Sequence, residues 1–130
     1  KYPEKVALKL GFIPALAHKI YAGADIFLMP SKSEPCGLAQ MIACSYATVP
    51  VVRSVGGLYD SIRSYGEEGA NGFRFDNYNA HELLFTLKTA LALYKDKKSW
   101  GKLTLGAKNS DFSWDNSASK YIAIYNDLLN

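Results

Sequence analysis

The stretch SEPCGLAQ, residues 33–40, combines residue types that could hold a phosphorylated sugar. It follows an apolar run, and an apolar helical pattern begins within it. Gly37 has no side chain to block a close backbone approach, so the N–H groups of Cys36, Gly37 and Leu38 could bind a phosphate at a helix start. Glu34 would repel a phosphate, but its carboxylate could accept hydrogen bonds from sugar hydroxyls beside it. An acidic residue that merely caps the helix is the alternative.

A second stretch, VRSVGGLYDSI at residues 52–62, has the same order of strand, glycine and helix. Gly56 and Gly57 could again bring backbone N–H groups to an anion. An ordinary strand-to-helix turn explains the pair equally well. In open α/β sheets, ligands bind beyond the carboxyl ends of the strands, which is where both stretches would lie.

The elements that must position these residues alternate between short apolar runs and helical patterns. Strands are expected at residues 6–10, 25–29, 50–53 and 72–75, and helices at 15–22, 37–46, 58–62, 80–94, 97–107 and 114–129. This order predicts an α/β fold with a parallel sheet and helices on both faces. Four short strands are few for such a sheet, so we expect it to be incomplete at its N-terminus. The apolar stripe of the last helix is expected to be mostly core. If a domain against which this helix packs is missing, Tyr121 and Tyr125 are expected to be exposed or to take part in self-association.

The bulk composition limits the function classes. The chain has 130 residues, 48% of them hydrophobic and 21% charged, which suits one domain over residues 1–130 or a piece of a larger one. A net charge of +3 is too weak to indicate nucleic-acid binding. No apolar run reaches the roughly 18 residues of a membrane span, and no signal peptide is visible, so we expect a cytoplasmic protein without a membrane partner. Cys36 and Cys44 have no partners at zinc-site spacing, so no metal is expected.

The run AHKIYAGADIFLMPSKSEPCGLAQMIACSYATVPVVRSVGGLYDSI, followed by NGFRF and DFSW, resembles the C-terminal half of bacterial glycogen synthases and plant starch synthases. The resemblance extends from about Val6 to Leu129. It implies a GT-B glycosyltransferase, with two Rossmann-like domains and an active site between them. This chain would be the later part of the second, donor-binding domain, with C-terminal helices.

The resemblance also implies the reaction. The family transfers glucose from ADP-glucose, or less often UDP-glucose, to the non-reducing end of an α-1,4-glucan, with retention of configuration and without a metal or other cofactor. The family's acceptor-binding motif lies in the first domain, and two basic residues that neutralise the diphosphate lie at the start of the second. Neither falls within these 130 residues, so we expect the chain alone not to elongate glucan. Another GT-B glucosyltransferase and a non-catalytic nucleotide-sugar-binding module are the alternatives.

Carried over by position, Glu34 would bind the hydroxyls of the transferred glucose as the catalytic-site carboxylate. The resemblance assigns donor-binding roles to seven further residues: Phe12, His18, Cys36, Gly37, Leu38, Gly56 and Gly57. Phe12 would stack on the adenine where the family usually has a tyrosine, and His18 would lie near the nucleotide. His18 could equally be an ordinary packed residue on a helix face. Ala39 replaces a threonine that reaches a phosphate in the family, and Ile13-Pro14 replaces Asp-Glu; both substitutions put the strength of donor binding in question.

Overall fold

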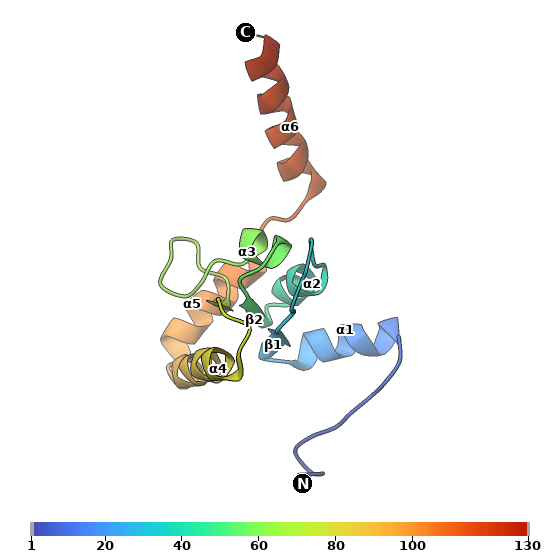
Figure 1. Cartoon of the computed structure of the whole chain (residues 1–130), viewed down its shortest axis with the longest axis vertical. Coiled ribbons are helices and arrows are strands. Elements are labelled where there is room, and N and C mark those ends of the chain that lie inside the picture. Colours follow the sequence, from blue (N-terminus) through green and yellow to red (C-terminus); the bar gives the residue numbers. More distant parts are fainter. Residues whose placement is uncertain (1, 130) are drawn as a thin grey trace.

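The computed structural model describes residues 2–129 of the chain, and its elements follow the expected order (Figure 1). The helices are α1 (Pro14–Gly23), α2 (Ala39–Ser45), α3 (Gly57–Ser61), α4 (Ala80–Lys95), α5 (Lys97–Lys108) and α6 (Trp114–Leu129). The strands are β1 (Ile26–Met29), β2 (Val49–Arg53) and β3 (Phe73–Phe75). Helices and strands alternate up to β3, and helices alone follow, as the hydrophobic pattern predicts.

The three strands form a parallel sheet in the order β1-β2-β3. Ile26 pairs with Val49 in the first ladder, and Val51 pairs with Phe73 in the second. The central strand β2 is apolar and almost wholly buried, as is typical of a strand covered on both faces. The α/β parallel-sheet fold is therefore confirmed.

Alternate side chains of β2 enter two separate cores, because successive residues of a strand point to opposite faces of the sheet. Val49 and Val51 pack in one core with residues of α4 and α5, including Trp100 and Leu103. Val52 packs in the other core with residues of α2, α3 and α5: Cys44, Leu58 and Ala107. Helices thus cover both faces of the sheet, and loops lie beyond the carboxyl ends of the strands.

The strand expected at residues 6–10 is absent from the structure. Val6, Leu8 and Leu10 are 67%, 81% and 80% exposed, and the segment runs from the N-terminal region to the outer end of α1 (Figure 1). An apolar run becomes a strand only where a neighbouring strand edge supplies hydrogen bonds and cover. Within residues 2–129, no strand pairs with this segment, so apolar composition alone was a misleading signal.

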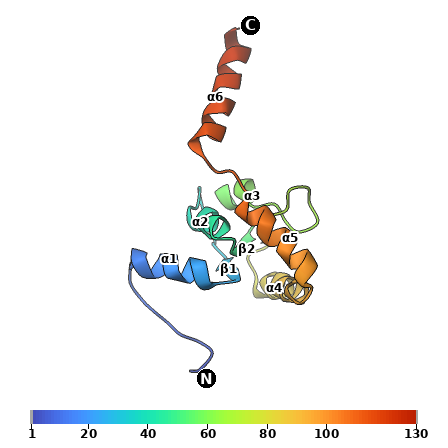
Figure 2. The same cartoon turned by 180° about the vertical axis from the view of Figure 1, so that it is seen from behind.

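The expectation that the apolar stripe of α6 is mostly core is wrong for the described chain, and the alternative that leaves Tyr121 and Tyr125 exposed is the one observed. Both views show α6 extending away from the sheet and its covering helices (Figures 1 and 2). None of its residues is buried, and Tyr121 and Tyr125 are 58% and 59% exposed. An amphipathic stripe predicts burial only where another surface faces it. Across residues 2–129, no helix combines the length and the apolar character needed to cross a membrane.

Candidate functional site

Two loops meet at the carboxyl ends of β1 and β2. The first loop, residues 30–38, joins β1 to α2, and the second, residues 54–56, joins β2 to α3. A Cβ atom added to Gly56 would lie 1.9 Å from the carbonyl oxygen of Glu34, and one added to Gly57 would lie 2.0 Å from that of Cys36. The Gly57 N–H group donates to the Pro35 carbonyl oxygen at 3.3 Å. The glycine pair therefore serves a backbone contact between the loops, which neither alternative from the sequence had specified.

Helix α2 begins at Ala39, two residues later than expected, and this changes the role of Gly37. Leu38 is the N-cap, and no side chain caps the helix, so the interpretation of Glu34 as a helix cap is wrong. Gly37 lies in the loop with φ +76°, a left-handed conformation that favours glycine. The N–H groups predicted to bind phosphate thus belong to a loop rather than to the first turn of a helix.

The loop presents three successive N–H groups with no protein acceptor. Within residues 2–129, the N–H groups of Cys36, Gly37 and Leu38 donate no hydrogen bond. The carbonyl groups of Pro35, Cys36 and Gly37, in contrast, all accept hydrogen bonds from the protein. A backbone segment with satisfied carbonyls and free N–H groups can accept a negatively charged group.

Gln40 supplies two of those hydrogen bonds and is the main residue that the sequence reasoning missed. Its side chain is fully buried at the start of α2. The Nε2 atom donates to the carbonyl oxygens of Cys36 at 3.2 Å and Gly37 at 2.7 Å, and it lies 3.1 Å from Ser61 Oγ. Ser61 Oγ in turn donates to the Gly57 carbonyl oxygen at 2.6 Å, which joins both loops in one network. A lone amide among the apolar residues of this helix was the available signal.

Arg53, at the end of β2, is a second residue that the sequence reasoning missed. Its guanidinium donates to the carbonyl oxygen of Lys32 at 2.7 Å and to that of Asp76 at 3.2 Å, and it lies 5.5 Å from the centre of the Tyr78 ring. Arg53 therefore ties the end of β2 to the loops that follow β1 and β3. A charged residue that closes an otherwise apolar strand was the signal for this position.

The structure gathers some of the predicted residues and leaves others apart. Glu34 is half-buried in the first loop beside Gly56, and its carboxylate makes no hydrogen bond within the described residues. Phe12 is 94% exposed just before α1. His18, on α1, pairs through Nδ1 with the Tyr46 hydroxyl at 3.1 Å, at the opposite end of α2 from the loop. Phe12 and His18 therefore make no contact with the Glu34 loop in this structure.

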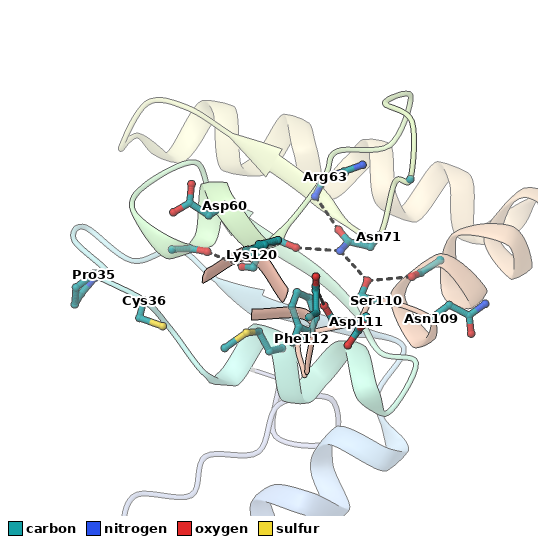
Figure 3. A pocket seen from close by; sticks show the side chains of 16 residues that line it. Pro35, Cys36, Asp60, Arg63, Asn71, Asn109, Ser110, Asp111, Phe112 and Lys120 are labelled. Atoms are coloured by element: carbon teal, nitrogen blue, oxygen red, sulfur yellow. Dashed lines mark hydrogen bonds between the residues drawn. The ribbon is translucent and has the colours of Figure 1, made fainter. Parts of the chain in front are cut away.

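A cleft of about 640 Å³ adjoins the two loops. Cys36 and Gly57 line it, as do Ser110 and Phe112 from the segment before α6 and Lys120 from α6 itself (Figure 3). The buried side chain of Asn71 supports its wall, because it accepts from the Arg63 N–H group and donates to Ser61 O and Ser110 Oγ. Two buried amide side chains, those of Gln40 and Asn71, thus support the part of the cleft wall that the loops form.

Comparisons with known proteins bear on this arrangement. Residues 4–104 match the family model described as Glycosyl transferases group 1. The chain is 51% identical over 130 residues to a protein named glycogen synthase from Halalkalibacterium halodurans, covering 98% of this chain and 27% of that protein. It is 53% identical over 131 residues to a glycogen synthase from Desulfitobacterium hafniense, covering 98% and 28%. The chain therefore spans just over a quarter of the length of these relatives.

A solved structure has the same fold over most of the chain. It is the catalytic domain of Starch Synthase IV from Arabidopsis thaliana, bound to ADP and acarbose. The TM-score is 0.81 at 38% sequence identity, and the match covers 91% of this chain and 25% of that one. The resemblance that the motifs indicated is confirmed by these relatives.

Proposed function

Because this chain belongs to the group 1 family of glycosyl transferases, we propose that it forms the donor-binding part of an enzyme that transfers glucose from ADP-glucose to an α-1,4-glucan. Relatives named glycogen synthase support the reaction, and the similar starch synthase structure, which holds ADP, supports the nucleotide. The observation that carries the proposal is the row of three free N–H groups at Cys36, Gly37 and Leu38, beyond the carboxyl ends of β1 and β2.

In this proposal the three N–H groups bind the diphosphate of the donor. Negative charge on the diphosphate grows as its bond to glucose breaks, and preorganised donors stabilise that charge more than they stabilise the bound donor. The contact of Gly56 and Gly57 with the first loop keeps these donors in place before the donor arrives. The chain's contribution to catalysis is then electrostatic and needs no metal.

Glu34 is proposed to bind the glucose itself. Its carboxylate lies two residues before the N–H row and is free to accept hydrogen bonds from sugar hydroxyls. Such contacts orient the anomeric carbon for transfer with retained configuration. Phe12 is proposed to stack on the adenine, and His18 to lie near the nucleotide, after movement of α1 or of the segment before it, because neither contacts the loop in the described arrangement.

We expect the chain by itself to bind donor without elongating glucan. Transfer requires an acceptor held next to the donor, and this proximity is a large part of what such an enzyme supplies. The chain spans only 27% of the length of the H. halodurans relative, and the acceptor is proposed to bind elsewhere in the whole protein. Synthesis of glucan from ADP-glucose by the purified chain would contradict this expectation.

Calorimetric titration of the chain with ADP, UDP and ADP-glucose tests the donor proposal. We expect ADP to bind with a dissociation constant of about 1 mM, or about −4 kcal/mol, and UDP to bind more weakly. Glu34→Ala should leave ADP affinity unchanged and abolish the additional affinity that the glucose of ADP-glucose provides. An equal loss of affinity for ADP and for ADP-glucose in Glu34→Ala would overturn the proposal. So would the absence of any nucleotide binding by the folded chain.

A further inference from the structure

We infer that Gln40 is a positioning residue, which turns the N–H groups of Gly37 and Leu38 outward so that they can bind the diphosphate of the donor. The inference rests on the proposed function, because that function supplies the anion. Gln40 is fully buried and therefore acts through the backbone of the loop rather than by touching the ligand. No role for Gln40 follows from the family motif alone.

The orientation follows from the geometry of the peptide bond. All described peptide bonds are trans, so each carbonyl points to the side opposite the N–H group of the next residue. Gln40 Nε2 binds the carbonyl oxygens of Cys36 and Gly37 from the buried side. The N–H groups that share those two peptide planes belong to Gly37 and Leu38, and they consequently point away from Gln40. These groups have no acceptor within the described residues.

The Oε1 atom of the Gln40 amide makes this arrangement less stable than a fully hydrogen-bonded one. Oε1 is buried and has no hydrogen-bond partner within residues 2–129, and an unpaired buried acceptor is destabilising. Reversing the amide would not relieve the cost, because it would set Oε1 against two carbonyl oxygens. A Cβ atom at Gly37 would lie 2.5 Å from this same Oε1, so Gly37 is the residue that admits the amide. The network therefore leaves Gln40 Oε1 unpaired, while Gln40 Nε2 holds the carbonyl groups of Cys36 and Gly37 toward the buried side.

Gln40 also links the first loop to the start of α3 through the side chain of Ser61. Its Nε2 lies 3.1 Å from Ser61 Oγ, which donates to the carbonyl oxygen of Gly57. Gly57 N–H donates to the Pro35 carbonyl, which turns the N–H group of Cys36 outward by the same peptide geometry. Three successive N–H groups are thus oriented by three hydrogen bonds, two donated by Gln40 and one by Gly57.

The test compares Gln40→Met with a matched control, Thr48→Val. Both replacements remove a buried donor with little change in volume, and Thr48, like Gln40, bonds two backbone carbonyls, those of Tyr21 and Ala24, away from the loop. Residual dipolar couplings of the Gly37 and Leu38 amides, measured in the labelled, ligand-free chain, report the directions of the N–H vectors. Titrations with ADP and with adenosine, which lacks phosphate, then separate diphosphate recognition from base recognition.

We expect Gln40→Met to change both couplings and to weaken ADP binding about tenfold, while adenosine binding stays the same. Thr48→Val should lower the unfolding temperature but keep the couplings and the ADP affinity. Unchanged couplings in Gln40→Met, or ADP affinity within twofold of the original, would overturn the inference. If Gln40 had only a general structural role, Gln40→Met would weaken the binding of ADP and of adenosine equally. This result would also overturn the inference.

A second measurement covers the case in which Gln40→Met does not fold. Gln40 is the only glutamine of the sequence, so its side-chain resonances are identified by selective labelling. The inference then requires a coupling across the hydrogen bond from Gln40 Nε2 to the Gly37 carbonyl, and downfield shifts of the Gly37 and Leu38 amides with ADP but not with adenosine. If the original chain binds no ADP, the proposed function fails, and the dipolar couplings alone decide whether Gln40 orients the loop.

Discussion

Gly57 lies so close to Cys36 that a Cβ atom at position 57 would stand 2.0 Å from the Cys36 carbonyl oxygen. Cys36 lies in the loop that follows β1, and Gly57 begins α3 directly after the loop that follows β2, so the contact between them is made of main-chain atoms alone. A side chain at this point would separate the loops and turn the Cys36 peptide group. The geometry of the proposed phosphate site therefore depends on the absence of a side chain at the start of α3, as well as on the residues of the first loop.

Gly57→Ala is expected to destabilise the fold by about 3 kcal/mol, because the new methyl group has no space against backbone atoms. Gly101→Ala is the matched control: Gly101 lies in helix α5, and a Cβ atom there meets nothing within 4 Å. The control should stabilise the protein by about 0.5–1 kcal/mol through helix propensity. Urea denaturation of both variants measures the two effects. Equal stability of the two variants would show that the loops do not approach as closely as described.

The buried thiol of Cys44 should make stability depend on alkaline pH. Burial raises the pKa of this thiol from 9.0 to about 12. Between these values the unfolded chain loses the thiol proton while the folded chain keeps it, so the free energy of unfolding falls as pH rises above about 9. The slope contributed by this group is at most about 1.4 kcal/mol per pH unit.

Cys44→Ala removes that contribution and isolates it from the other groups that titrate in the same range. The difference in unfolding free energy between the original chain and Cys44→Ala should be constant below pH 8 and should shrink between pH 9 and pH 10.5. Under native conditions a thiol reagent should modify the exposed Cys36 and leave Cys44 intact. A difference that stays constant throughout would show that Cys44 is not buried as a neutral thiol.

Glu82 should give the fold an acid-sensitive contact at the start of α4. Hydrogen bonds from the Asn77 backbone and side chain, with a further one from the Asp76 N–H group, hold the pKa of the Glu82 carboxyl below its ordinary value. The carboxylate therefore stabilises the fold above about pH 4.5, and this stabilisation is lost as pH falls below that value. Glu82→Gln should lower the urea midpoint of unfolding at pH 7. At pH 3 the midpoints of the original chain and of the variant should differ less. A difference that is independent of pH would contradict this role.

The sequence predicted most of the fold because the signals for its elements are local. The period of apolar residues in 80–94 indicated α4 to within one residue at its C-terminal end, and the short apolar run at 25–29 indicated β1. Residues 6–10 have the same apolar character but form no strand, because strand formation depends on a neighbouring edge that no local pattern reports. The stripe on α6 likewise records a preference for burial without showing what covers it.

The site was predicted less completely, because its geometry comes from contacts between distant residues. The motif around Glu34 predicted which loop would hold the phosphate, and that role stays a prediction. The contact between Gly57 and Cys36 was not predicted, because it depends on the packing of two strands against each other. Gln40 looked like an ordinary helix residue, since its two carbonyl partners become visible only once the loop is folded back over it. Arg53 was overlooked for the same reason, because its partners follow β1 and β3.

The measurement that tests the central claim most directly is a calorimetric titration of the chain and of Gly37→Val with ADP. Gly37 has φ +76°, and a Cβ atom there would lie 2.5 Å from Gln40 Oε1, so valine must displace the loop that carries the three free N–H groups. We predict that the original chain binds ADP and that Gly37→Val, still folded by its circular dichroism spectrum, does not. ADP binding of equal strength by both proteins would show that this loop does not hold the diphosphate.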